Sequence, residues 1–496
     1  AKGDKRFKDE DWEQHFLFDF VKQSYLIAAR HIHDTVSGAE GLDESTQQKV
    51  NFFTRQYIDA LSPSNFALTN PEVFRETVKS HGQNLIKGLN NLLHDVSDDG
   101  QLRIRMTDTS AFEMGKNVAT TPGKVVFQTD MMQLLQYTPS TPDALKRPLL
   151  IVPPWINKFY ILDLREKNSY IKWCVDQGHT VFVISWVNPD ERLAEKSFDS
   201  YLLEGTMAAV DAIVEQTGAK EINAAGYCLG GTLLSIAAAA MAGEGDDRLA
   251  SLTLLAAQVD FTEPGELALF IDPSQLHFLE SMMWNRGYLS ADQMAGAFQL
   301  LRSNDLIWSR MVHDYLMGER TAMNDLMAWN ADLTRMPERM HSQYLRQLFL
   351  NDSLSEGHYR VGDRPVALLD IGTPIFSVAT LTDHVAPWRS VHKLHYLTQT
   401  EIHFVLTSSG HNAGIVSEPG RPRRRYQSLT RSAGGKYVSP DEWLQAAPQH
   451  EGSWWPEWVS WLQARSGEPA HPPRMGAASR GFKALCDAPG EYVMEK

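Results

Sequence analysis

Cysteine is scarce in this chain, whose 496 residues include only Cys174, Cys228 and Cys486. Their wide spacing fits neither a disulfide framework nor a zinc site, so we expect no metal and a reducing compartment. Basic charge is also in short supply, because 61 acidic side chains outnumber 47 lysines and arginines and leave a formal net charge of −14. No broad basic face is then available to neutralise phosphates, which argues against a nucleic-acid partner.

Long apolar runs are missing too. The N-terminus is charged and lacks the apolar core of a signal peptide, and no uninterrupted apolar stretch reaches membrane-spanning length. We therefore expect a cytoplasmic protein without a transmembrane segment. The chain starts at Ala1 rather than at Met, which indicates processing or a fragment. Its length is sufficient to bury a large core and to hold more than one structural unit.

The most informative segment spans residues 221–232, where a short apolar strand is followed by a sharp turn and an alanine-rich helix. Cys228 stands at the turn, with Gly226 two residues before it and Gly230 two residues after it. This is the spacing of a nucleophile elbow, G-x-S-x-G, with sulfur in place of oxygen, and small neighbours are needed because strand and helix pass close together. The helix N-terminus favours negative charge at the sulfur. The alternative is a structural cysteine, since free cysteine is among the most buried residue types.

Hydrophobic periodicity divides the chain into five parts. Residues 1–98 show helical apolar stripes, and residues 99–260 alternate short apolar strands with helical segments, as in a parallel sheet. Residues 261–365 are helical and rich in Met, Trp, Leu and Asn, strands resume within 366–465, and 466–496 form an extended tail. We predict an α/β fold: an α/β-hydrolase core of mostly parallel strands with helices on both faces, an N-terminal helical region and an inserted helical cap. The cap residues fit a lid and an ordinary helical core equally well.

Two more residues come directly after late predicted strands, in the order nucleophile, acid, histidine that an α/β-hydrolase requires. They are Asp383 and His411. Taken alone, Asp383 has the character of a turn aspartate and His411 that of a surface-loop histidine. Their order and placement after Cys228 favour a catalytic triad of the three residues. His384 competes as the base, but it adjoins the predicted acid, so we expect it to support the site or to contact substrate.

An oxyanion hole in this fold uses two backbone amides. We assign one to Leu229, which follows the predicted nucleophile, and the other to Ile156, in the loop after the strand predicted at 149–153. Trp155 and Asn157 flank Ile156, and we expect them to support the loop or to contact substrate.

Over essentially its whole length, the chain resembles the poly(3-hydroxyalkanoate) synthases, class I in particular. The segments that carry the resemblance are the elbow around Cys228, the runs Pro153–Leu164 and Gly452–Trp458, the pair Asp383-His384, Ser409-Gly410-His411, and Trp329–Asp332 in the predicted cap. The resemblance implies that Cys228, Asp383 and His411 match the family's catalytic cysteine, aspartate and histidine. Family members usually carry a longer N-terminal segment than the one before Arg6, and the role of that segment is open for this chain.

Synthases of this family polymerise 3-hydroxyacyl-CoA into a polyester and release CoA. The resemblance therefore implies an acyltransferase acting on (R)-3-hydroxyacyl-CoA, with 3-hydroxybutyryl-CoA as the first candidate substrate; CoA is a product, and no cofactor is expected. Transfer from one thioester to another on Cys228 is nearly isoenergetic, and His411 is the expected general base. Asp383 either orients His411 or itself activates the 3-hydroxyl group. The resemblance further implies a homodimer associated with polyester granules.

Three consecutive arginines, Arg423, Arg424 and Arg425, follow the predicted histidine and are candidates to contact the phosphates of CoA, although a solvated loop is the commoner role of a short charge run. Two other functions stay open. One is a thioesterase or depolymerase on the same fold, for which serine would be usual at position 228. The other is a non-catalytic granule-coating protein.

Overall fold

The computed structural model describes residues 4–96, 109–294, 307–320 and 324–496. The chain divides into two compact units, the first comprising Ala1–Ala111 with Ala295–Ala331 and the second Phe112–Met294 with Asp332–Lys496. The region predicted as a cap, residues 261–365, is therefore divided between the two units. Its middle part groups with the N-terminal helices.

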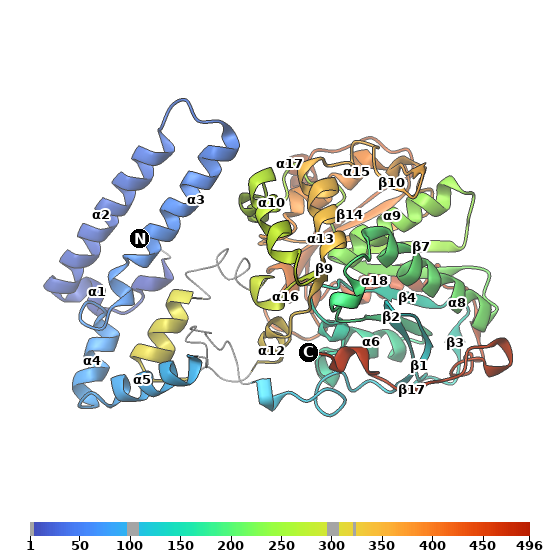
Figure 1. Cartoon of the computed structure of the whole chain (residues 1–496), viewed down its shortest axis with the longest axis horizontal. Helices are drawn as coiled ribbons and strands as arrows, with labels where there is room; N and C mark the ends of the chain where they lie inside the picture. The colour runs from blue at the N-terminus through green and yellow to red at the C-terminus, as the bar shows by residue number, and fades with distance from the viewer. Residues whose placement is uncertain (1–3, 97–108, 295–306, 321–323) are drawn as a thin grey trace. The chain divides into compact units, whose positions relative to one another are not determined.

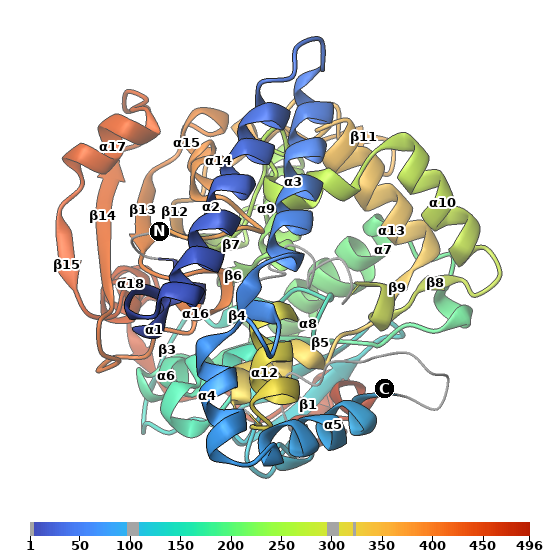
Figure 2. The same cartoon turned by 90° about the vertical axis from the view of Figure 1, so that its left-hand side faces the viewer.

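Helices and the loops between them make up the first unit, which has no β-strand among its described residues. Its helices are α1 (Asp11–Gln14), α2 (Phe16–Ser37), α3 (Glu44–Ala60), α4 (Pro71–Lys79), α5 (Gln83–Asp95), the π-helix η10 (Met311–Leu316) and α12 (Asp325–Ala331). The long helices α2 and α3 lie side by side (Figure 2). Capping residues set where they begin: the Asp43 side chain accepts from the Thr46 amide before α3, and Asn70 caps α4 in front of Pro71.

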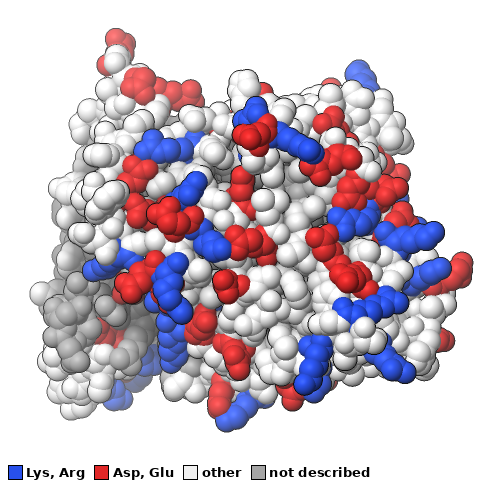
Figure 3. Space-filling view, turned by 45° about the vertical axis from the view of Figure 1, so that its right-hand side comes forward, with Lys and Arg blue, Asp and Glu red and all other residues white. Residues whose placement is uncertain are grey.

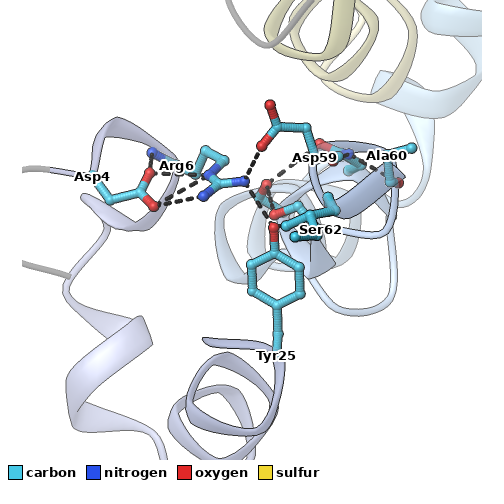
Figure 4. Close-up of polar contacts among 9 residues, drawn as sticks. Asp4, Arg6, Tyr25, Asp59, Ala60 and Ser62 are labelled. Atoms are coloured by element: carbon cyan, nitrogen blue, oxygen red, sulfur yellow. Dashed lines mark hydrogen bonds and ion pairs between the residues drawn. The ribbon is translucent and has the colours of Figure 1, made fainter. Parts of the chain in front are cut away.

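Arg6 ties the start of the first unit to its two long helices (Figure 4). The Arg6 guanidinium donates hydrogen bonds to the Asp4 carboxylate, to the Tyr25 hydroxyl of α2 and to the Asp59 carboxylate of α3, each at 2.8 Å. A planar guanidinium with several donors suits such a junction, because it bonds three partners at once.

Helix α5 packs tightly against η10, and this contact explains why part of the predicted cap belongs to the first unit. A Cβ atom at Gly88 would lie 1.8 Å from the Tyr315 carbonyl oxygen, so only glycine permits the approach. The Asn84 amide donates to the Leu316 carbonyl at 2.9 Å, and the Tyr315 hydroxyl donates to Asp95 at 2.8 Å. Sequence periodicity alone does not reveal such a long-range pairing.

The second unit is built on an eleven-stranded sheet (Figure 1). In spatial order its strands are β15 (Gln449–Glu451), β14 (Arg425–Arg431), β13 (Ile402–Thr407), β12 (Ile375–Thr380), β7 (Leu249–Leu255), β6 (Ile222–Tyr227), β4 (Leu149–Val152), β5 (Val181–Trp186), β2 (Met132–Tyr137), β1 (Gly123–Gln128) and β17 (Cys486–Asp487). The six strands from β13 to β5 run parallel, and the outer strands pair antiparallel.

Burial explains the apolar runs of the central strands. Every residue of β4, β5, β6 and β12 is buried, as expected for parallel strands covered on both faces. The predicted α/β fold is thus confirmed, whereas the tail predicted at 466–496 is not simply extended: it contributes β17 to the sheet edge, and Pro469–Ala470 (β16) pairs with Ala144–Leu145 (β3). Two further short pairs are Tyr288–Leu289 (β8) with Met336–Pro337 (β9), and Arg360–Val361 (β10) with Arg364–Pro365 (β11).

Helices connect the strands of the second unit. They are α6 (Tyr170–Asp176), α7 (Phe198–Ser200), the π-helix η7 (Tyr201–Met207), α8 (Ala208–Thr217), α9 (Leu229–Gly243), α10 (Pro273–Met283), α13 (Glu338–Tyr344), the π-helix η11 (Leu345–Leu350), α14 (Trp388–His392), α15 (Leu394–Leu397), α16 (His411–Ile415), α17 (Pro440–Ala446) and α18 (Trp455–Gln463). Helix α9 packs on the central strands, and nearly all of its residues are buried.

No helix within the described ranges is both long and apolar enough to cross a membrane. Acidic and basic side chains alternate over the face of the protein shown in Figure 3.

Candidate active site

The local structure around Cys228 follows the predicted strand–turn–helix pattern. Strand β6 ends at Tyr227, α9 begins at Leu229, and Cys228 between them has φ 52° and ψ −126°. A non-glycine residue at positive φ is strained and is held there by its surroundings. The Cys228 amide donates to the Leu255 carbonyl of β7 at 2.8 Å, while the Cys228 carbonyl accepts from the Gly231 amide, also at 2.8 Å.

The glycines of the elbow are required by close backbone approaches. A Cβ atom at Gly226 would lie 2.5 Å from the Cα atom of Gly231. A Cβ atom at Gly230 would lie 2.2 Å from the Val152 carbonyl oxygen at the end of β4. No side chain fits at either position, so these residues bring β6, α9 and the loop after β4 together around the thiol.

The predicted acid and histidine lie in direct contact. Nδ1 of His411, the first residue of α16, is 2.7 Å from Oδ2 of Asp383, in the turn after β12. The Asp383 carboxylate also accepts hydrogen bonds at 2.8 Å from the Thr380 hydroxyl and from the amides of Val385 and Ala386. All four contacts fix the carboxylate, so it holds one edge of the imidazole in a defined orientation.

Electrostatics strengthen this pair. Burial alone would raise the pKa of Asp383, but the facing His411 and the hydrogen-bond donors outweigh burial and hold that pKa below its usual value. Burial alone would lower the pKa of His411, yet the charges of Asp383 and of a Cys228 thiolate, together with hydrogen bonds to both, raise it well above its ordinary value. The structure therefore brings the three predicted residues together, with the imidazole between the carboxylate and the half-buried thiol.

Tyr227 packs against the face of the His411 imidazole. Its ring stacks on the His411 ring with centroids 5.6 Å apart and planes 29° apart. Its hydroxyl donates to Oδ1 of Asn412 at 2.6 Å. Because the side chain of Tyr227 is buried and comes from β6, it links the nucleophile turn to the histidine loop.

Thr334 restrains the loop that carries the predicted oxyanion amide of Ile156. The Thr334 amide donates to the Ile156 carbonyl at 3.0 Å, and its hydroxyl donates to the Trp155 carbonyl. Leu229, the other predicted donor, is the first residue of α9, where the backbone amide has no acceptor within the helix. Both assignments to the oxyanion hole stay predictions.

The other predicted residues have different surroundings. Trp155 is buried and stacks on Tyr201 with ring centroids 4.5 Å apart, so it packs in the core. Asn157 is buried and pairs through its backbone with Leu333. The His384 side chain is exposed, which leaves it outside the contact between the acid and the histidine.

The three arginines predicted as possible CoA contacts differ in their surroundings. Arg423 and Arg425 are exposed, in keeping with a solvated loop. Arg424 is half-buried, and its guanidinium donates to the hydroxyl of Ser409, which has φ 86° in the loop before His411. Burial lowers the pKa of Arg424. This residue is therefore occupied in holding the histidine loop.

Several residues that support the site were not predicted from the sequence. They are Tyr227, Thr334, Thr380, Asn412 and Arg424 in its supporting role. Tyr227 adjoins the predicted nucleophile and Asn412 the predicted histidine, so proximity to a motif was an available signal for both. Nothing in the local sequence marks Thr334, because its contacts are with a loop far away along the chain.

A thiol, an imidazole and a carboxylate at the carboxyl ends of parallel strands define an α/β-hydrolase-fold protein with cysteine in the nucleophile position. Comparisons with known proteins agree: residues 147–418 match the model described as "alpha/beta hydrolase fold", and residues 3–174 match "Poly-beta-hydroxybutyrate polymerase (PhaC) N-terminus". The chain belongs to the poly(3-hydroxyalkanoate) polymerase family and is an acyltransferase.

Curated relatives match almost the whole chain. The Poly(3-hydroxyalkanoate) polymerase of Methylorubrum extorquens is 48% identical over 497 residues, which cover 99% of this chain and 81% of that protein. The PhaC subunit of Cupriavidus necator is 37% identical over 500 residues, covering 99% and 83%. Among solved structures, a monoacylglycerol lipase from Paleococcus ferrophilus matches with a TM-score of 0.38 and 12% identity, over 68% of this chain and 99% of that one.

Proposed function

We propose that the protein polymerises (R)-3-hydroxyacyl-CoA, with 3-hydroxybutyryl-CoA as the first candidate, through an acyl thioester on Cys228. The observation that carries the proposal is the 2.7 Å contact between Nδ1 of His411 and Oδ2 of Asp383. The same imidazole also interacts with the Cys228 thiol. The family relationship supports the polymerase activity, and this geometry supports the covalent route.

In the first step, His411 takes the proton of the Cys228 thiol, and the sulfur attacks the thioester carbonyl of the substrate. The amides of Leu229 and Ile156 stabilise the resulting oxyanion. Collapse of the tetrahedral intermediate breaks the bond from carbon to the sulfur of CoA, and the leaving thiolate takes the proton from His411. One thioester has replaced another, so the acyl group keeps its reactivity.

In the second step, a 3-hydroxyl group attacks the acyl thioester on Cys228. Its proton passes to His411 and then to the departing sulfur, and an oxoester forms. Asp383 holds the imidazole and stabilises its positive charge; direct activation of the hydroxyl by Asp383 is the alternative. The four hydrogen bonds that Asp383 already accepts favour the orienting role.

The test supplies purified protein with 3-hydroxybutyryl-CoA and follows CoA release, polymer formation and the intact mass of the protein. We expect polymer, and an acyl adduct that maps to Cys228 and is absent from Cys228→Ala. Cys174→Ala is the matched control, because this free, buried cysteine belongs to α6 and not to the elbow. Free 3-hydroxybutyrate without polymer would instead identify a thioesterase, and unchanged function in Cys228→Ala would identify a non-catalytic granule protein.

Homodimerisation, a cytoplasmic location and association with polyester granules complete the proposal. Their support is the resemblance to class I synthases. Sedimentation of the protein with and without 3-hydroxybutyryl-CoA measures the first, and the distribution of a fluorescent fusion in cells that accumulate polyester measures the other two. A monomer at all concentrations, or a label spread evenly through such cells, would contradict them.

A further inference from the structure

A row of aromatic rings joins the loop after β4 to the loop after β7 by way of α13 and η11. Trp155 meets Phe198 edge-on at 5.6 Å between ring centroids, and Phe198 stacks with Tyr344 at 6.2 Å and 17°. Tyr344, the last residue of α13, meets Phe349 nearly perpendicularly at 5.3 Å, and Phe349 lies 5.0 Å from Phe261. Both loops lead away from strand ends next to the nucleophile turn, so the row borders the candidate active site.

Tyr344 is the only member of this row with a hydroxyl group. Within the part of the chain that the structure describes, this hydroxyl makes no hydrogen bond to another protein group, and the residue is half-buried. Burial, and then the charge of a Cys228 thiolate, raise the pKa of the Tyr344 phenol. Tyr344 and Cys228 pack against the same hydrophobic core, and the protonated phenol is a hydrogen-bond donor without an acceptor among the described protein groups.

We propose that the Tyr344 hydroxyl donates a hydrogen bond to the 3-oxygen of the hydroxyacyl group that is transferred to Cys228, and so selects 3-hydroxyacyl over unsubstituted acyl thioesters. This inference rests on the proposed function. The predicted oxyanion amides of Leu229 and Ile156 serve the carbonyl oxygen, so the 3-oxygen, two carbons further along the acyl chain, needs a donor of its own. Phe198 and Phe349 beside Tyr344 supply apolar contacts for the carbon chain.

Discrimination between two substrates isolates this contact better than total activity does. A donor built to meet a substrate hydroxyl is left unpaired when the analogue lacks that group, whereas a purely structural tyrosine affects both substrates alike. The two probes are 3-hydroxybutyryl-CoA and butyryl-CoA, which differ only in the 3-hydroxyl group. Rapid-quench measurement of CoA release in the first turnover, with intact-mass detection of the Cys228 adduct, reports acylation before any chain grows.

Tyr344→Phe removes only the hydroxyl group. We expect the ratio of first-turnover rates, 3-hydroxybutyryl-CoA over butyryl-CoA, to fall about 5- to 10-fold in this variant, while the butyryl-CoA rate is no lower than in the wild type because no unpaired donor is left. Tyr359→Phe is the matched control: its ring also meets Phe198, at 6.3 Å, and its buried hydroxyl has no hydrogen-bond partner among the described residues, but burial and the charge of Asp199, not Cys228, raise the pKa of this phenol. The control should keep the wild-type ratio.

An unchanged ratio in Tyr344→Phe would overturn the inference, as would equal losses with both substrates or a lowered Tm that accounts for the lost rate. Failure of the proposed function has a different signature: wild-type protein would then acquire no adduct on Cys228 from 3-hydroxybutyryl-CoA. The two failures are thus distinguishable in one set of measurements.

Discussion

The Asp383→Asn substitution tests the orientation of the imidazole most directly. Oδ1 of Asp383 accepts from two backbone amides, at Val385 and Ala386, which only an oxygen can satisfy. The amide nitrogen of an asparagine must therefore take the place of Oδ2, 2.7 Å from Nδ1 of His411. Because that nitrogen is a donor, Nδ1 must become an acceptor and the imidazole proton moves to Nε2. Nε2 is then unable to take the thiol proton.

The substitution also removes the negative charge that raises the pKa of His411, so burial is left to lower it. We expect the first-turnover rate with 3-hydroxybutyryl-CoA to fall by about 10³- to 10⁴-fold, equivalent to about 4–5.5 kcal/mol in activation free energy. The apparent KM should change little, because the carboxylate does not bind substrate in this mechanism. Asp370→Asn, at an exposed aspartate of the same unit, is the control. Retention of more than a tenth of the wild-type rate by a folded Asp383→Asn protein would refute the tautomer argument.

Three further predictions concern the surroundings of the site and the core. Tyr227→Phe keeps the ring stacked on the imidazole but removes the donor to the amide oxygen of the half-buried Asn412, so kcat should fall up to about tenfold, and Asn412→Ala should add little to that loss in a double-mutant cycle. Gly230→Ala places a methyl group 2.2 Å from a carbonyl oxygen of β4 and should lower the free energy of unfolding by about 1–3 kcal/mol and abolish CoA release; wild-type activity would contradict the elbow geometry. Burial lowers the pKa of His179 and of His341 to about 4. In the unfolded chain the histidine pKa values are near 6.5, so as pH falls the unfolded state binds protons before the folded state does, and stability is lost between about pH 6.5 and 4. Urea titration should show that the free energy of unfolding falls by about 1 kcal/mol per histidine from pH 7 to 5.5. This fall should be smaller in His179→Phe.

Local sequence signals were sufficient for the elbow and for the six central parallel strands. The spacing of glycines around Cys228 is a local signal: Gly226 permits the tight crossing of β6 and α9, and Gly230 permits the approach of α9 to the end of β4. Continuous apolar runs indicated buried parallel strands, and polar residues directly after two of them indicated the acid and the histidine. Parallel strands bring their carboxyl ends to one edge of the sheet, so position along the chain translates into position in space and Asp383 and His411 lie in contact. Their catalytic roles stay predictions.

Long-range packing decided the rest. Residues 311–316 share the helical character of the predicted cap, but their partner is α5, and the choice depends on the absence of a side chain at Gly88. Two other contacts also join segments that no sequence periodicity relates. Thr334 bonds to the loop after β4, and the Arg424 guanidinium donates to the Ser409 hydroxyl. Which aromatic residues of a helical segment pack against one another depends on how the helices outside the sheet are arranged on it. That arrangement arises from the summed contacts of many side chains. A local pattern of apolar residues shows which residues are buried, but it does not show which distant residues they pack against.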